Sequence, residues 1–198
     1  MSVKNFDTKK MVLLAILTAM VVVLQVMAVF LKPFFPMFTI STVFIPITIG
    51  AALCGIYAGA WLGLVFGFAV LISGDANLFL SINAGGTILT VLAKGTLAGL
   101  AAAIVYKLFE NESKTFAVIF AAVACPAVNT GIFVAGCYLF FLPTISAWAE
   151  EAGFLNAAFF IFFGMIGINF FIEMAINMFF SPVITRLIDY GKKIRASK

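Results

Sequence analysis

The sequence predicts an all-α integral membrane protein with six transmembrane helices and both termini on the cytoplasmic side. Of its 198 residues, 64% are hydrophobic and only 10% are charged, and the mean hydropathy is +1.20. A soluble domain carries about 25% charged residues because its surface faces water. The apolar residues also form runs of about 20, the length that crosses a bilayer core. We therefore exclude a water-soluble globular domain and expect one membrane domain, without a separate soluble catalytic domain.

The predicted spans follow from the apolar runs and their interruptions. The first is the uncharged run 11–30, and the polar segment before it lacks a small-residue cleavage site, which favours a retained helix over a signal peptide. The segment Lys32 to Phe38, KPFFPMF, carries two prolines and should form an irregular loop. The remaining spans are expected at 42–54, 58–73, 87–109, 115–142 and 154–187.

The apolar stretch from Thr42 to Ser73 allows two topologies. Small residues recur in it at spacing four, a pattern that lets helix backbones approach closely and, taken alone, favours one continuous helix. These residues are Ala51, Gly55, Gly59, Gly63 and Gly67. With two short helices that turn near GIYAG, ten Lys and Arg residues lie on one side of the membrane, only Lys32 lies on the other, and Lys94 is inside a span. This positive-inside bias leads us to predict two helices and cytoplasmic termini.

The residue types that the sequence lacks limit its chemistry. The chain has no histidine, which removes imidazole catalysis and most zinc sites, and its three cysteines stand apart without CxxC spacing. It contains no GxxxxGK[ST] loop, so it cannot use ATP by itself. The pI of about 9.1 comes from basic residues that flank spans. We therefore expect no metal, no cofactor and no nucleic acid, with membrane lipid around the protein.

Two ionisable residues lie inside predicted spans, where a charge costs about 2.5 to 3.5 kcal/mol at the helix centre. Lys94 lies roughly 10 Å inside the outer boundary of the fourth span, at about 1.5 Å per residue, and Glu173 lies near the middle of the sixth span. One interpretation is a buried ion pair that holds the two helices in register. In the other, Lys94 binds an anionic or carbonyl group of a ligand, and Glu173 is a helix-locking or coupling residue.

Amide and aromatic side chains near these charges complete a predicted binding site that opens to the exterior. Asn169 and Asn177 lie one helical turn on either side of Glu173 and share its face. Asn129 lies in CPAVNTG of the fifth span, and Asn83 lies in SINAGGT near the outer end of the fourth. The alternative for each asparagine is a hydrogen bond to a neighbouring helix. The aromatic residues that would wall a cavity for a flat or partly apolar solute are Phe34, Phe35, Phe38 and Phe79.

The order of these features resembles a known family. The first span reads LLAILTAMVVVL, in which Ala15 and Ala19 form an AxxxA motif near a basic amino terminus. The second opens after the proline-bearing loop as FTISTVFIPITIGAALCGIYAGAWLGLVFG. From about Lys9 to Leu187, the chain resembles the substrate-binding S component of energy-coupling factor (ECF) vitamin transporters, which are small six-helix proteins of about this size.

This resemblance implies a function and a set of residue roles. An S component is not an enzyme: it binds a vitamin from outside a prokaryotic cell with high affinity. It docks on a transmembrane T component that two cytoplasmic ATPases drive. The resemblance assigns Ala15 and Ala19 to partner docking and Lys32 to Phe38 to a gating loop, with Lys32, Phe34 and Phe35 as its key residues. The predicted substrate-binding residues are Lys94, Asn129, Asn169, Asn83 and Phe38.

The sequence does not identify which vitamin binds, and it also leaves two other functions as alternatives. An aromatic cavity suits riboflavin, whereas a lysine in the outer half suits a carboxylate such as pantothenate or folate. A stand-alone small-solute carrier or channel is one alternative, although the two halves of the chain show no convincing repeat. A membrane-embedded lipid enzyme is the other, although no pair of acids shares a helix face.

Overall fold

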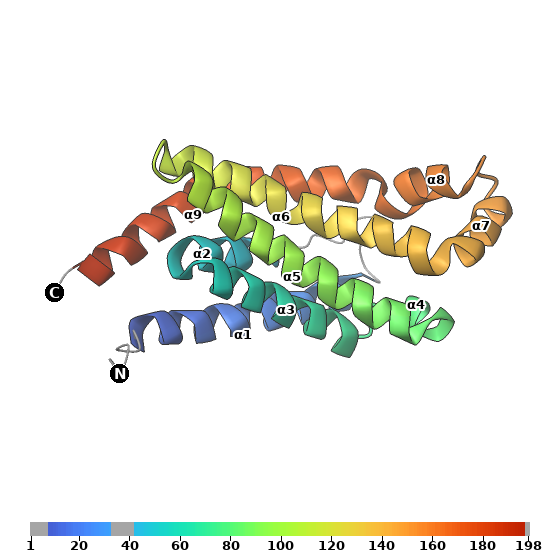
Figure 1. Cartoon of the computed structure of the whole chain (residues 1–198), viewed down its shortest axis with the longest axis horizontal. Coiled ribbons are helices and arrows are strands. Elements are labelled where there is room, and N and C mark those ends of the chain that lie inside the picture. The colour runs from blue at the N-terminus through green and yellow to red at the C-terminus, as the bar shows by residue number, and fades with distance from the viewer. Residues whose placement is uncertain (1–7, 33–41, 197–198) are drawn as a thin grey trace.

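The computed structural model describes residues 8–32 and 42–196 as a helical bundle. The start of α1 (Thr8–Leu31) and the end of α9 (Gly167–Ala196) lie at one end of its long axis, which we call the terminal end (Figure 1). The short helices α4 (Asn77–Ile82), α7 (Leu142–Glu151) and α8 (Ala157–Phe159) lie at the opposite end. The other elements are α2 (Phe44–Cys54), α3 (Ile56–Ile72), α5 (Ala84–Phe109), α6 (Lys114–Gly136) and two π-helical segments, η1 (Cys137–Phe141) and η2 (Phe160–Ile166).

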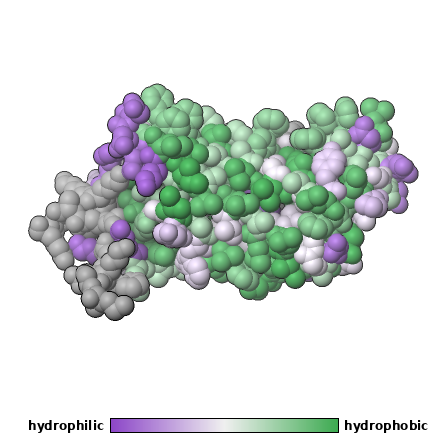
Figure 2. All heavy atoms as spheres, viewed as in Figure 1, coloured by the Kyte–Doolittle hydropathy of each residue, from purple (hydrophilic) through white to green (hydrophobic). Residues whose placement is uncertain are grey.

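The surface and the helix lengths suit a membrane. Within the described ranges, four helical stretches are long and apolar enough to cross one, and three shorter apolar helices accompany them. The four are Thr8–Leu31, Ala84–Phe109, Lys114–Glu151 and Phe170–Tyr190. Figure 2 shows apolar side chains over the middle of the bundle and hydrophilic ones toward its two ends. The predicted all-helical class with several long apolar helices is therefore confirmed.

The stretch 42–73 forms two helices that meet at Gly55, as the distribution of basic residues predicts. The backbone of Gly55 has a φ of +94°, and a Cβ added there would meet no atom within 4 Å. Glycine is thus required by the backbone conformation and not by crowding. The Gly55 carbonyl accepts hydrogen bonds from the amides of Ala58 and Gly59, which begins α3. The spacing-four pattern does not extend α2 and α3 into one helix.

The stretch 154–187, which the sequence predicts as one span, is not one helix. The chain forms α8 and η2 first, and the helix is broken at Gly167, where φ is +44°. From there α9 continues to Ala196. The predicted span 115–142 is also only part of a longer helical stretch, which runs through η1 and α7 to Glu151. The sequence pattern misses both features because a π-helical turn keeps the same apolar residues and changes only their register.

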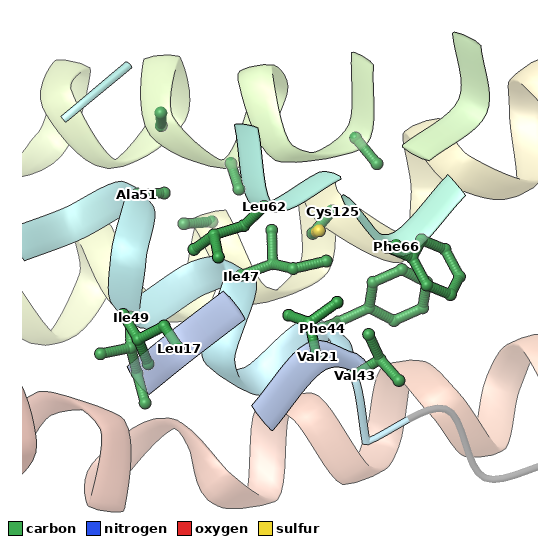
Figure 3. Packing of buried hydrophobic residues seen from close by; sticks show 14 of the residues in the cluster. Leu17, Val21, Val43, Phe44, Ile47, Ile49, Ala51, Leu62, Phe66 and Cys125 are labelled. Carbon is green, nitrogen blue, oxygen red and sulfur yellow. The ribbon is translucent and has the colours of Figure 1, made fainter. Parts of the chain in front are cut away.

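An apolar core fills the half of the bundle nearest the terminal end. Leu17 and Val21 of α1 pack there with Phe44 and Ile47 of α2 (Figure 3). The rings of Phe44 and Phe66 meet edge to face, with centroids 5.7 Å apart. The core continues with small residues of α5 and α6 and with two isoleucines of α9: Ala98, Ala102, Ala117, Ala121, Ile184 and Ile188.

In a seam between α3 and α5, backbone touches backbone. Gly59 and Gly63 of α3 face Gly99 and Gly95 of α5, and a Cβ on any of the four would overlap the carbonyl oxygen of the facing glycine. These contacts use the spacing-four glycines that the sequence marks as a site of close helix approach. The seam fixes the rotation of α5 and so determines which of its residues face the rest of the bundle.

Candidate ligand-binding cavity

A cavity of about 260 Å³ lies in the half of the bundle away from the termini. Residues of α1, α3, α5, α6 and α9 line it, with η1 and η2 at its edge. The lining mixes aromatic rings with amides, hydroxyls and four ionisable side chains, which are Lys32, Asp75, Lys94 and Glu173. A concave site with mostly apolar walls and a few polar groups is typical of small-molecule binding.

One face of α5 supplies three polar residues to the cavity. Thr87, Thr90 and Lys94 all line it, and their spacing of three and four places them on the same side of the helix. Lys94 directly precedes Gly95 of the α3–α5 seam. The seam therefore orients this polar face toward the cavity.

Asn83, which the sequence predicts as a substrate-binding residue, lies outside the cavity. It is exposed and does not line the cavity. Its side-chain oxygen accepts a hydrogen bond from the Gly86 amide at 2.9 Å, and its carbonyl accepts one from Thr87 Oγ1 at 2.7 Å. Asn83 is thus the N-cap of α5, a position that asparagine favours because its side chain satisfies a free amide. It sets the start of the helix that carries Lys94.

Lys94 extends between two aromatic rings. Its Nζ lies 5.5 Å from the ring centroid of Phe133 and 5.9 Å from that of Phe66. In the part of the chain that the structure describes, Lys94 forms no ion pair with Glu173. Asp75 and Glu173 attract its charge from a longer distance. The geometry therefore does not support a helix-locking Lys94–Glu173 pair, and the ammonium faces ring π-electrons and the cavity.

Two hydrogen-bonding oxygens on the cavity residues have no partner within the described ranges. They are Oγ1 of Thr90 and Oδ1 of Asn129. Both side chains are more than nine-tenths buried, with exposures of 6% for Thr90 and 9% for Asn129. A buried polar group without a partner costs about 1 to 3 kcal/mol.

A polar cluster joins the end of α1 to the turn between α3 and α4. Lys32 Nζ forms an ion pair with Asp75, and Gln25 Nε2 donates a hydrogen bond to the other oxygen of Asp75 at 3.2 Å. All three side chains line the cavity. This cluster neutralises one of the two lysines of the cavity and ties the first helix to the turn that follows the third.

Phe79 of α4 gathers an aromatic group at the edge of the cavity. Its ring centroid lies 4.9 Å from that of Phe141, 5.8 Å from that of Phe133 and 6.2 Å from that of Trp148, all at edge-to-face angles. Phe79, Phe133 and Phe141 all line the cavity. Phe79 therefore lies where the sequence predicts an aromatic wall, and Phe133 and Phe141 extend that wall.

Glu173 and Asn177 occupy neighbouring turns of α9. Glu173 lines the cavity, and Asn177 is fully buried, with its Nδ2 donating to the Glu173 carbonyl at 2.8 Å. Ser181 repeats this pattern one turn later, since its Oγ donates to the carbonyl of Asn177. The predicted polar stripe is therefore partly an internal hydrogen-bond ladder of the helix.

The structure brings some of the sequence-predicted residues together and leaves others apart. Lys94, Asn129, Glu173 and Lys32 line one cavity. Ala15 and Ala19 are exposed on α1 and take no part in it. Phe34, Phe35, Phe38 and the side chain of Asn169 lie outside the described residues.

Sequence analysis missed several cavity residues. Asp75 lies in a loop, and only the fold shows that it meets Lys32. Gln25 carries a detectable signal, because it is the only amide side chain in the otherwise apolar run 11–30. Thr90 is recognisable from sequence only by its spacing from Lys94 on one helix face.

The cavity has the groups for binding a small molecule. Among the described residues, no cluster of three or more His, Cys, Asp or Glu side chains is placed to hold a metal ion. What it offers instead is a cation, hydrogen-bonding oxygens without partners, and aromatic walls. These groups can bind an anionic group, a hydrogen-bond donor and a ring on the same ligand.

A family model described as ECF transporter, substrate-specific component matches residues 9–185. The match spans both halves of the bundle and includes every residue of the cavity from Gln25 to Glu173. No curated protein and no solved structure matched the chain.

Proposed function

Because the chain belongs to the substrate-specific components of energy-coupling factor (ECF) transporters, we propose that it captures a water-soluble vitamin from outside a prokaryotic cell. Members of this family are substrate-binding membrane subunits and not enzymes, so a lipid enzyme is set aside. The cavity around Lys94 is the proposed vitamin site, with Asn129 and Asn169 as further ligand contacts. The candidate vitamins are riboflavin, pantothenate and a folate-like compound.

The observation that carries this proposal is the convergence of Lys94, Asn129 and Glu173 on one cavity. The three residues come from α5, α6 and α9, which are distant in sequence. Polar groups are costly inside a bilayer, and when they serve only to join helices they find partners within the protein. Here Lys94 and Asn129 line a cavity that a solute can fill, and Lys94 forms no ion pair with the described residues.

Six transmembrane helices with both termini in the cytoplasm suit this function best. The start of α1 and the end of α9 lie at the same end of the bundle (Figure 1), which supports an even number of crossings. With that end inside the cell, the flanking basic residues obey the positive-inside rule. The cavity, in the opposite half, then opens to the exterior, and the segment from Lys32 to Phe38, with Phe34 and Phe35, gates it.

The energy for transport comes, in this proposal, from a T component and two cytoplasmic ATPases. The chain has no ATP-binding loop of its own. Ala15 and Ala19 are exposed, on the side of α1 opposite the buried Leu17 and Val21. Exposed alanines at spacing four leave a shallow groove in which a partner helix can pack.

Two measurements test the proposed function. Calorimetry of the purified protein against a panel of water-soluble vitamins should show tight binding of one of them without turnover. Uptake into proteoliposomes should then require an added ECF motor. Tight binding with uptake in the absence of the motor would favour the stand-alone carrier.

A substitution at the docking motif separates binding from transport. We expect Ala15→Trp to abolish motor-dependent uptake and to leave vitamin affinity near that of the wild type, because the indole holds the partner helix away. The control is Ala135→Trp, at an equally exposed alanine on α6, a helix on the opposite side of the bundle from α1 in Figure 1. Normal uptake by Ala15→Trp would remove the support for docking through α1.

A further inference from the structure

The charges that line the cavity are unequally compensated. Of its two lysines, Lys32 is paired with Asp75. Within the described ranges, Lys94 has no carboxylate at ion-pair distance. Its ammonium has three hydrogen-bond donors, and the contacts recorded for it are the rings of Phe66 and Phe133. Among the described residues, Lys94 is therefore the cation of the cavity whose hydrogen-bond donors are still available.

The surroundings of Lys94 define what can pair with it. An aromatic face attracts a cation but accepts little of its hydrogen-bonding capacity, so the rings position the ammonium without neutralising it. An anionic oxygen beside Lys94 Nζ would form a charge-assisted hydrogen bond, which is stronger than one between neutral groups. A cationic ligand would be repelled by this ammonium, and a neutral ring system would leave its charge facing only the more distant carboxylates of Asp75 and Glu173.

The cavity also lacks hydrogen-bond donors for two of its oxygens. Thr90 lies one helical turn from Lys94 on the same face of α5, and Asn129 lies on α6. Both residues line the cavity, and their Oγ1 and Oδ1 atoms are buried. An amide oxygen only accepts hydrogen bonds, and the described residues supply no N–H or O–H group to it. A ligand that brings a donor as well as an anion would match both features.

We propose that the ligand of this cavity is a small organic acid, with a carboxylate that binds Lys94 and an N–H or O–H group that donates to Asn129 and Thr90. This inference rests on the proposed function and narrows the vitamin class. It favours a pantothenate-like or other carboxylate vitamin over riboflavin, whose ring system is neutral. Phe66 and Phe133 would hold the carbon skeleton on either side of the ammonium.

Matched pairs of compounds test this proposal directly. Calorimetry would compare each acid with its uncharged counterpart: pantothenate with pantothenol, nicotinate with nicotinamide, and biotin with biotin amide. Riboflavin and thiamine complete the panel. We expect one acid to bind at least tenfold more tightly than its counterpart, because only the acid neutralises Lys94.

Variants of Lys94 identify the group that recognises the acid. In Lys94→Met, which keeps the length of the side chain and removes the charge, the acid should bind at least tenfold more weakly, and its advantage over the neutral compound should disappear. Lys94→Arg should recover part of that advantage. Thermal unfolding in detergent checks that each variant is folded, and the wild-type comparison of acid and counterpart stands even if a variant is not.

The outcomes distinguish this inference from the function on which it rests. Equal binding of an acid and its neutral counterpart, or selective binding of riboflavin or thiamine, would overturn the organic-acid ligand and leave a vitamin-binding S component in place. An unchanged preference in folded Lys94→Met would also overturn it. Absence of binding for every vitamin in the panel would instead contradict the proposed function itself.

Discussion

The two faces of α5 differ in both packing and chemistry. On one face, Gly95 and Gly99 meet the glycines of α3 so closely that no side chain fits between them. On the other, Thr90 and Lys94 line the cavity. Among the described residues, Thr90 Oγ1 has no hydrogen-bond partner and Lys94 forms no ion pair. Lys94 and Gly95 are adjacent in sequence, so the change occurs within a single residue step.

This difference teaches which residues serve folding and which serve binding. The seam is stabilised by packing that is complete within the protein, and any added atom disturbs it. The cavity face has the opposite property, since its unpaired polar groups lower the stability of the empty protein and are useful only when a ligand is present. Substitutions on the two faces should therefore have opposite effects on stability and on binding.

The largest effect is expected at the seam. In Gly63→Ala, the new methyl group would overlap the carbonyl oxygen of Gly95, and a backbone oxygen cannot move without separating the helices. We expect a loss of about 3 kcal/mol or more in stability, at the upper end for overpacked sites, visible as a much lower unfolding temperature in detergent.

Gly131→Ala provides the matched control for the seam. Gly131 also lies inside a helix, but a methyl group there would meet open space. Because alanine is the better helix former by about 0.5 to 1 kcal/mol, this variant should be as stable as the wild type or slightly more so. Equal destabilisation by both substitutions would show that the seam is not specially packed.

A smaller effect of the opposite sign is expected on the cavity face. Asn129→Leu removes a buried oxygen without a partner in the described structure, so the empty protein should gain about 1 kcal/mol in stability. Ligand affinity should fall at least tenfold, because the amide no longer accepts from the ligand. Unfolding temperature and calorimetry measure the two quantities on the same sample.

Asn177→Leu is the control for that variant. Asn177 is also buried with an Oδ1 atom that lacks a partner among the described residues, but it does not line the cavity. We expect its replacement to change stability and to leave ligand affinity within about twofold of the wild type, since a twofold change is well under the 1.4 kcal/mol of a tenfold one. Equal loss of ligand affinity in both variants would show that Asn129 does not act on the ligand through its position in the cavity.

The smallest effect is expected where α1 meets the α3–α4 turn. Asp75→Asn breaks the ion pair with Lys32, whose side chains are 41% (Lys32) and 23% (Asp75) exposed, so stability should change by less than about 1 kcal/mol. The ligand should dissociate a few times faster, because the end of α1 is no longer tied across the cavity. Stopped-flow measurements of ligand release would detect this change.

Asp189→Asn is the comparison for that rate. It breaks the exposed ion pair with Lys114, which joins the start of α6 to α9 far from the cavity. Its effect on ligand release should be absent. A rate change of the same size in both variants would indicate a general loosening of the bundle and not a local effect of the Lys32–Asp75 ion pair.

Much of the fold could be predicted from sequence, because hydrophobic runs and basic flanks reflect the bilayer directly. The division of the stretch 42–73 into two helices at Gly55 was predictable from the distribution of the basic residues. The break at Gly167 could not be predicted, since the chain has 16 glycines and nothing local distinguishes one with positive φ. The π-helical segments were missed for a related reason, because they change register without changing composition.

The candidate site was predictable where burial itself was the signal. Lys94 and Glu173 were recognisable because ionisable residues within spans are rare and costly. Asp75 was not, since a loop residue finds its partner only through the tertiary fold. Asn83 illustrates an ambiguity of sequence, because the same amide side chain that suits a ligand also suits a helix N-cap.

The shortness of α2 has a consequence for solute movement. Its 11 residues extend only about 16 Å at about 1.5 Å per residue, roughly half of the bilayer core. Phe44 and Ile47 are fully buried, and α2 contacts α1, α3, α5, α6 and α9. In the proposed function, this half-length helix would close the path between the cavity and the cytoplasm, and a captured solute would leave only through its point of entry until a partner rearranges the protein.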